Sequence, residues 1–317
     1  MFDLTALREA AAFVHQHVPA TPQHAWPLLA ARLGCQVWVK HENHAPTGAF
    51  KVRGGLVYVR SLLEGGTPPR GLVTATRGNH GQSMALAARQ AGLPLVIVVP
   101  QGNSREKNAA MRALGAELVE YGVDFDVARE EAGRMAAELG YTMVPSFHPE
   151  LVRGVATYAL ELFEAVQELD CVYVPIGMGS GICGLIQARN LLGLNTEIVG
   201  VVSSAADAYA QSFEQGRIVT TATAETFADG MACRVPHADA FALVREHAAR
   251  IVRVDDSEIA EAMRLYHETT HNTAEGAGAA ALAALMQERG KQAGKRVAVV
   301  LSGANVDRER YAEVLRG

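Results

Sequence analysis

The sequence predicts an α/β protein whose sheets are mainly parallel and covered by helices. Short apolar runs bounded by Gly, Pro or Asn alternate with Ala-rich helical segments along most of the 317 residues. Several runs are continuous Val/Ile/Leu stretches, which are typical of parallel strands buried on both faces. The composition agrees, because 49% hydrophobic, 20% charged and 6% aromatic residues suit a globular α/β chain.

The elements can be placed in order along the chain. Strands are expected at 37–40, 72–76, 95–100, 117–121, 171–176, 198–203 and 297–302. Helices are expected at 81–92, 104–114, 126–139, 154–168, 182–192, 257–270 and 277–288. Ser104 is expected to cap its helix, and Asp256 or Ser257 to open the helix from Glu258. Because no linker separates two halves, two lobes would have to share the chain discontinuously.

Charge and composition exclude several classes of function. The formal charge is −5, from 29 basic and 34 acidic residues, and the basic residues are scattered, so nucleic acid is not expected as a partner. No apolar run reaches membrane-spanning length, and no membrane partner is expected. Neither the histidines nor the cysteines have the spacing of a metal site. Free buried thiols of a reducing cytoplasm are therefore expected at Cys35, Cys171, Cys183 and Cys233.

Lys51 is the candidate catalytic residue. It follows the turn 46–50, PTGAF, which leads into a helix. Packing beside Phe50 near a helix N-terminus would lower the pKa of its ammonium group through desolvation and the helix dipole. A lysine that is neutral near pH 7 forms a Schiff base with an aldehyde. The competing interpretation is an ordinary surface lysine, and three further segments count against it.

The second segment directly follows the strand at 72–76 and opens a helix. Its central residues are Thr76, Arg77, Gly78, Asn79 and His80. A strand-to-helix turn presents free backbone N–H groups and the positive helix end, which suit a carboxylate or a phosphate. A Gly-Asn turn that only caps a helix would have a similar sequence, so this motif alone leaves both interpretations open.

The third segment is a glycine-rich loop after the strand at 171–176. Its residues are Gly177, Met178, Gly179, Ser180 and Gly181. Such a loop can surround a phosphate with backbone amides. The Gly-x-Gly spacing also suits NAD, but the loop lies in mid-chain. The strand at 198–203 ends without an acid for the ribose, and Asp207 comes late. A phosphate monoester therefore fits better than a dinucleotide.

The fourth segment is the last strand, 297–302, which ends at Ser302 in a tight turn. Together the four segments resemble the fold-type II pyridoxal-phosphate enzymes, in the group of threonine/serine dehydratases and serine racemase. The motifs stand in family order and at family-like spacing from about residue 21 to residue 307. The FADGM stretch at 227–231 and the EGAGA stretch at 275–279 are also similar to family segments.

The resemblance implies a tryptophan-synthase-β-like architecture. Two open, twisted, mostly parallel sheets would be flanked by helices, with the active site in the cleft between a large and a small domain. Residues 1–66 and 147–317 would form the large domain, and residues 67–146 the small one.

The resemblance also implies roles for the motif residues. Lys51 would carry pyridoxal phosphate as a Schiff base and act as general base, with Phe50 packed behind the cofactor. Asn79 would bind the 3′-oxygen of the ring, residues 177–181 the phosphate, and Ser302 the pyridine nitrogen. The turn 76–80 would hold the substrate carboxylate.

The resemblance also concerns two acidic segments. Glu275 would lie near the cofactor ring. A mono- or divalent cation near Glu225 and Asp229 is a further implication of the resemblance, although an ordinary solvated carboxylate is the favoured interpretation of Glu225.

Two residues depart from the family pattern. Ala49 stands where the family usually has serine, and Arg77 stands where racemising members place a serine that serves as acid and base. Since arginine cannot act as a base at neutral pH, little racemase activity is predicted. Three roles remain open for Arg77: binding the substrate carboxylate or cofactor phosphate, pairing with a second carboxylate of the substrate, or pointing into solvent.

The predicted function is α,β-elimination by a pyridoxal-phosphate-dependent lyase. A β-hydroxy-α-amino acid of the threonine, serine or phenylserine type would yield a 2-oxo acid and ammonia. The alternatives are a 3-hydroxyaspartate ammonia-lyase, a serine racemase-like or β-replacement enzyme and, in a different class, a non-catalytic cofactor-binding or amino-acid-sensing protein. We expect a cytoplasmic homodimer with a catabolic role, because the chain ends soon after Asp307 without room for the regulatory domain of biosynthetic threonine dehydratases.

Overall fold

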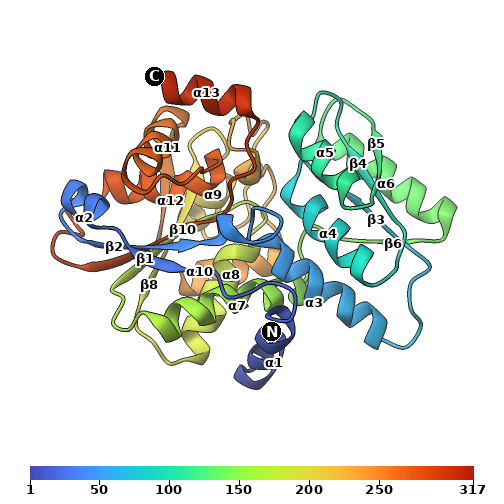
Figure 1. The fold of residues 1–317 in the computed structure, drawn as a ribbon, viewed down its shortest axis with the longest axis horizontal. Helices are drawn as coiled ribbons and strands as arrows, with labels where there is room; N and C mark the ends of the chain where they lie inside the picture. The colour runs from blue at the N-terminus through green and yellow to red at the C-terminus, as the bar shows by residue number, and fades with distance from the viewer.

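The computed structural model describes residues 1–317 and contains two sheets (Figure 1). The larger sheet has the strand order β1-β2-β10-β7-β8-β9. Its strands are β1 (Gln23–Ala25), β2 (Gln36–His41), β7 (Cys171–Pro175), β8 (Glu197–Ser203), β9 (Arg250–Val254) and β10 (Arg296–Leu301). All neighbours are parallel except β1, which runs antiparallel to β2.

The smaller sheet has four parallel strands in the order β5-β4-β3-β6. They are β3 (Leu72–Ala75), β4 (Leu95–Val99), β5 (Glu117–Glu120) and β6 (Thr142–Met143). The two helix-flanked, mainly parallel sheets confirm the predicted fold class.

Helices cover both sheets. The small unit consists of the smaller sheet with α4 (Asn79–Gln90), α5 (Arg105–Ala113) and α6 (Phe125–Leu139), on the right in Figure 1. The large unit consists of the larger sheet with the remaining helices except α3 (Lys51–Glu64). These are α1 (Leu4–Val14), α2 (Pro27–Leu33), η1 (Glu42–His44), α7 (Pro149–Ala165), α8 (Ser180–Leu191), α9 (Ala208–Gln215), η2 (Asp229–Met231), α10 (Ala238–His247), α11 (Asp256–Thr270), α12 (Gly276–Gln287) and α13 (Arg308–Arg316).

Strand alternation divides the large unit into two cores. On β7, Val172 and Val174 face the core formed with α1, α7, α8 and α10. Cys171 and Tyr173 face the opposite core, which contains α2, α11 and α12. Because both faces are covered, the central strands β10, β7 and β8 are mainly apolar, as the continuous Val/Ile/Leu runs predicted.

The helix that begins with Lys51 lies between the two units. α3 packs against α4 of the small unit and against α7 of the large unit. A Cβ at Gly54 would lie 2.7 Å from the carbonyl oxygen of Leu151 on α7, and a Cβ at Gly55 would lie 2.3 Å from the hydroxyl of Ser83 on α4. The consecutive glycines therefore let α3 approach both units closely, and this places its first residue at their junction.

Some element boundaries were predicted wrongly. The expected helix at 154–168 begins at Pro149, because His148 caps it and proline is accommodated at the first helical position. Asp255, rather than Asp256 or Ser257, caps α11, and Glu258 completes a capping box. Strand β9 was missed because charged Arg250 and Arg253 interrupt its apolar run.

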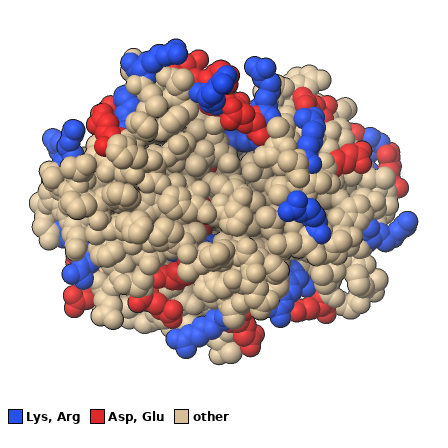
Figure 2. Space-filling model, viewed as in Figure 1, with Lys and Arg blue, Asp and Glu red and all other residues tan.

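Further features of the structure concern its surface charge, its helices, its cysteines and its possible metal ligands. On the face shown in Figure 2, Lys and Arg are interspersed with Asp and Glu. No helix is both long and apolar enough to cross a lipid bilayer. The four cysteines are free and buried, as predicted. No three His, Cys, Asp or Glu side chains are arranged to hold a metal ion.

Candidate active site

Four strand ends bring the predicted motif residues together. The turn 76–78 follows β3, residues 176–179 follow β7, Ser302 follows β10, and Lys51 comes after β2 and η1. In open α/β sheets, ligands bind in the crevice outside the carboxyl ends of the strands. The motifs therefore meet where this architecture places a ligand site.

Backbone pairing joins the Lys51 segment to the end of β10. Ala49 and Gly303 form an isolated antiparallel bridge, and the N–H of Phe50 donates to the carbonyl oxygen of Ser302 at 3.1 Å. Ala49 is fully buried, and a Cβ at Gly303 would lie 3.1 Å from the Ala49 Cβ and 2.4 Å from a Glu275 carboxylate oxygen. A small residue at 49 therefore suits this tight junction.

Lys51 has the lowered pKa that its position predicted. Burial lowers the pKa of its ammonium group to about 8, although the Glu275 carboxylate opposes this shift. Its Nζ lies 4.8 Å from the centroid of the Phe50 ring. Phe50 in turn packs edge-on against buried Tyr158, whose hydroxyl donates to the Gly181 carbonyl oxygen at 3.2 Å. The lysine segment and the glycine-rich loop are thus connected through one aromatic layer.

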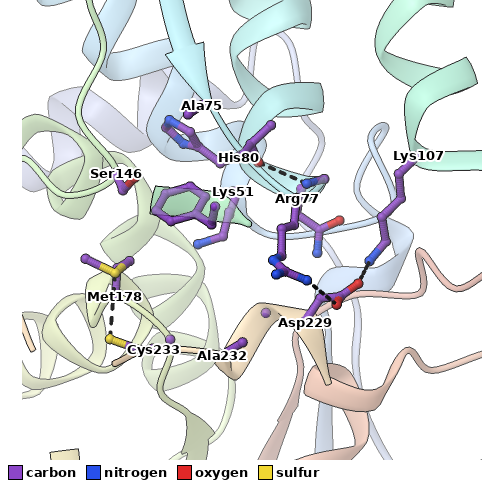
Figure 3. A pocket seen from close by; sticks show the side chains of 16 residues that line it. Lys51, Ala75, Arg77, His80, Lys107, Ser146, Met178, Asp229, Ala232 and Cys233 are labelled. Carbon is purple, nitrogen blue, oxygen red and sulfur yellow. Dashed lines mark hydrogen bonds and ion pairs between the residues drawn. The ribbon is translucent and has the colours of Figure 1, made fainter. Parts of the chain in front are cut away.

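All ten residues predicted to bind the cofactor line one pocket, which we call the glycine-loop pocket. Its wall consists of Phe50, Lys51, Asn79, Pro175, Gly177, Met178, Gly179, Ser180, Gly181, Gly230, Glu275, Ala277 and Ser302. A second pocket, the turn pocket, contains all five predicted substrate-binding residues and shares five wall residues with the first, namely Lys51, Asn79, Gly177, Met178 and Gly230 (Figure 3). Its wall consists of Lys51, Ala75, Thr76, Arg77, Gly78, Asn79, His80, Lys107, Phe125, Ser146, Gly177, Met178, Asp229, Gly230, Ala232 and Cys233.

The glycine-loop pocket has a cradle that fits a phosphate. Gly179 has φ +102°, a backbone conformation that favours glycine, and no side chain caps the first turn of α8. A Cβ at Gly177 would lie 2.1 Å from the carbonyl oxygen of Gly230. Gly177 therefore lets the loop pack against Gly230, and the N-terminus of α8 stays uncapped, where backbone N–H groups and the helix dipole favour an anion. Together with the amine of Lys51, this cradle fits pyridoxal phosphate.

Asn79 is held at the junction of the two pockets. Its Nδ2 donates to Glu275 at 2.5 Å, and its Oδ1 accepts from Asn305 at 2.8 Å. One of the two Nδ2 hydrogens remains for a ligand. The neighbouring His80 has a buried Nε2 without a hydrogen-bond partner. Burial lowers the pKa of His80 to about 3, and Lys51 adds to this shift, so its imidazole is neutral.

Arg77 contacts a group that none of its three interpretations included. Its Nη1 lies 3.8 Å from the carboxylate of Asp229, which comes from η2 of the large unit. Lys107 of α5 approaches the same carboxylate at 3.2 Å, and Figure 3 shows both cationic side chains directed at it. The Arg77 side chain is 41% exposed, so it faces the pocket mouth rather than a closed interior.

Sequence reasoning missed part of the turn pocket. Ser146, Asp229 and Cys233 also contribute to its wall. Lys107 and Phe125 were missed, because no motif marks them and only the docking of the small unit brings them to the site. The weak dinucleotide candidate, Asp207, instead accepts from Arg253 at 2.9 Å.

The comparisons with known proteins agree with this geometry. Residues 14–303 match the family described as pyridoxal-phosphate dependent enzyme. The chain is 34% identical to L-threo-3-hydroxyaspartate ammonia-lyase of Saccharomyces cerevisiae, over 96% of this chain and 93% of that protein. It is 33% identical to L-threonine ammonia-lyase of Thermotoga maritima, over 97% and 76% of the two chains.

A solved structure shows the same likeness in three dimensions. Maize serine racemase superposes with a TM-score of 0.91 at 28% identity, covering 99% of this chain and 97% of that one. Family match, sequence identity and fold thus coincide with a buried lysine beside a phosphate cradle, and the chain belongs to the pyridoxal-phosphate dependent enzymes.

Proposed function

We propose that this chain is an ammonia-lyase that converts a β-hydroxy-α-amino acid of the threonine or serine type to a 2-oxo acid and ammonia. The observation that carries the proposal is Lys51, whose pKa is lowered to about 8 and which lies in the wall shared by both pockets. The ammonia-lyase names of the two relatives support the reaction type.

The glycine-loop pocket holds the cofactor in this proposal. The backbone N–H groups of 177–181 would bind its phosphate, and Phe50 would pack behind its ring. Asn79 would donate to the ring 3′-oxygen, the Ser302 hydroxyl would pair with the pyridine nitrogen, and Glu275 would lie near the ring. When bound, pyridoxal phosphate supplies an aldehyde that reacts with amines and a conjugated ring that delocalises the charge of a deprotonated carbon.

The turn pocket holds the amino acid. The N–H groups of Asn79 and His80, in the first turn of α4, suit its carboxylate, because the N-cap residue Gly78 has no side chain to compete for them. The N–H groups of Thr76 and Gly78 are already used, by the Val98 carbonyl oxygen and the Thr76 hydroxyl. Lys51 accepts the Cα proton, for which a pKa of about 8 is well matched near neutral pH. The β-hydroxyl then takes up a proton and leaves as water as its C–O bond breaks, and hydrolysis of the released enamine consumes one water to form the 2-oxo acid and ammonia.

A panel of four amino acids tests the proposal. The purified protein with pyridoxal phosphate is expected to release 2-oxo acid and ammonia in equal amounts from one or more of L-threonine, L-serine, L-threo-3-hydroxyaspartate and L-threo-phenylserine. The two products are quantified separately, and kcat/KM ranks the substrates. Cofactor binding without product from any of the four would refute the lyase proposal in favour of a non-catalytic binding or sensing protein.

A 3-hydroxyaspartate ammonia-lyase is the second candidate. It is favoured by two cationic side chains, Arg77 and Lys107, in the wall of the turn pocket, and by the name of the yeast relative. Asp229 pairs with both cations, however, so a second substrate carboxylate would have to compete with it. A higher kcat/KM for hydroxyaspartate than for threonine in the panel would select this candidate.

Arg77 also predicts that the enzyme does not racemise its substrate. A racemase needs an acid–base group on the second face of the substrate, and a guanidinium at this position stays protonated at neutral pH. L-Serine incubated with the enzyme is therefore expected to remain free of D-serine, as measured by chiral chromatography. The appearance of an equal D/L mixture would contradict this role of Arg77.

Other expectations join the proposal without affecting the chemistry. We place the enzyme in the cytoplasm, which its four free cysteines support. We divide the chain into a large domain of 1–66 with 147–317 and a small domain of 67–146, which the two sheets support. A homodimer is supported by exposed Leu28 and by the broad area without charged side chains on the left in Figure 2. A cation near Glu225 and Asp229 also stays a proposal.

A further inference from the structure

The first turn of α5 docks onto the large unit. Ser104, the N-cap of α5, hydrogen-bonds through its hydroxyl to Asp307. Glu106 accepts from the N–H of Arg308 at 3.0 Å. Lys107, in the same turn, reaches Asp229 at 3.2 Å and Glu275 at 3.6 Å. These contacts of Ser104, Glu106 and Lys107 therefore fix the turn beside the site. Of the three residues, Lys107 is the one that lies in the wall of the turn pocket.

The side chain of Lys107 is buried and passes directly beside Gly78. Only 8% of it is exposed, and a Cβ at Gly78 would lie 2.4 Å from its Cδ. The absence of a side chain at Gly78 thus makes room for the lysine stem at the start of α4. A buried ammonium group needs charged partners, and Glu275 and Asp229 provide them.

Glu275 is the partner that belongs to the site. It is 5% exposed at the N-cap of α12, lines the glycine-loop pocket and accepts the hydrogen bond of Asn79. The charged groups that face it are Lys107 from α5, Asp229 from η2 and Lys51 from α3. Burial raises the pKa of Glu275, and Lys107 acts against that rise. Burial alone would lower the pKa of Lys107, but Glu275 and Asp229 outweigh it and raise that pKa.

We propose that Lys107 is a positioning residue, which ties the small unit to the large unit across the site and holds the Glu275 carboxylate in place beside Asn79 and Lys51. The inference rests on the proposed lyase function. Lys107 touches neither Lys51 nor Asn79 in a hydrogen bond, so it acts through Glu275. Its second partner, Asp229, also faces Arg77, which links the same lysine to the mouth of the turn pocket.

The test replaces Lys107 by methionine, which keeps the length of the side chain and removes its charge. The pH midpoint of Glu275 protonation is expected to rise by about 1 to 3 units, the usual effect of losing an opposite charge at this range. The carboxylic-acid infrared band of the full-length enzyme with bound cofactor reports this midpoint, and Glu275→Gln identifies the band by removing it. We expect kcat to fall about 10- to 100-fold, as misplaced catalytic groups do, and its pH profile to move with the Glu275 titration.

Three variants separate positioning from general stability. Lys107→Arg keeps the charge and is expected to restore the Glu275 midpoint and most of kcat. Gly78→Ala keeps the lysine but obstructs its path, and should move the midpoint in the same direction as Lys107→Met. Lys291→Met removes an exposed lysine that pairs with Glu288 at 2.9 Å, and should change neither quantity.

The outcomes distinguish this inference from the proposed function. An unchanged Glu275 midpoint and an unchanged kcat in Lys107→Met would overturn the positioning role, whatever happens to thermal stability. Absence of product from every substrate in the wild-type enzyme would overturn the lyase function instead. The infrared titration and its dependence on Lys107 could still be measured in that case.

Discussion

Replacing Lys51 by alanine is expected to abolish covalent cofactor binding and to lower kcat by about 10²- to 10⁴-fold or more, the contribution of a positioned acid–base group. Only this lysine lies in the wall of both pockets, and burial brings its pKa to about 8. Borohydride treatment of the wild-type enzyme should attach the cofactor to the peptide containing Lys51, as detected by mass spectrometry. The alanine variant should show no such adduct.

A matched control tests whether any lysine would serve. Lys295 is exposed and lies outside both pockets, so Lys295→Ala should retain the Lys51 adduct and the wild-type kcat. Circular dichroism should show the same secondary structure in both variants. Full activity in Lys51→Ala, or an adduct on another lysine of the wild-type enzyme, would refute the assigned role.

Replacing Arg53 by methionine is expected to destabilise the fold by about 3–5 kcal/mol, the cost of leaving a buried charge without its partner. Arg53 is fully buried and donates to Glu42 at 2.8 Å and to Glu161 at 2.6 Å. Lys40 joins the same cluster through a 2.6 Å contact with Glu161. Two cations thus face two carboxylates, and removing Arg53 leaves one negative charge in excess. The midpoint of urea unfolding measures the loss.

An arginine on the same helix serves as control. Arg60 is 43% exposed and pairs with Glu64 one turn away, so Arg60→Met should cost no more than about 1 kcal/mol. Equal losses in the two variants would contradict the importance of the buried network. Because Arg53 lies only two residues after Lys51, cofactor affinity should weaken with Arg53→Met and not with Arg60→Met.

The buried network also predicts a dependence on acid. Burial alone would raise the pKa of Glu161, but Arg53 and Lys40 outweigh it and hold that pKa at about 2. A carboxylate whose pKa is lowered in the folded state contributes stability above its unfolded pKa of about 4.3. That contribution is lost as the pH falls from there toward 2. Arg53→Met should show a smaller loss over this interval.

Local chemistry explains which elements the sequence predicted well. Continuous apolar runs marked β4 and β10, since strands buried on both faces are nearly continuous hydrophobic runs. Strands β1 and β6 are only three and two residues long, too short to show a period. Strand β9 carries Arg250 and Arg253, whose guanidinium groups pair with acidic residues from other elements. A local pattern contains no information about such distant partners.

The same reasoning applies to the site. Lys51, the turn 76–80, the loop 177–181 and Ser302 each lie on a strand end or a glycine-rich turn, and such positions are recognisable from sequence. Arg77 was recognised as unusual from the sequence. Its pairing with Asp229 could not be predicted, because the two residues come from different units. Lys107 was missed for the same reason.

The sequence by itself determined the α/β class and predicted the lysine and the glycine-rich loop of the site, because each depends on residues close together in the chain. Only the tertiary structure decided how the two units meet over that lysine. The glycines Gly54 and Gly55 set α3 against both units, and Lys107 and Arg77 then reach Asp229 across their junction. Ion pairs between distant segments depend on where the backbone places each side chain. The partners of the buried charges, and with them the environment of Lys51, therefore became known only from the fold.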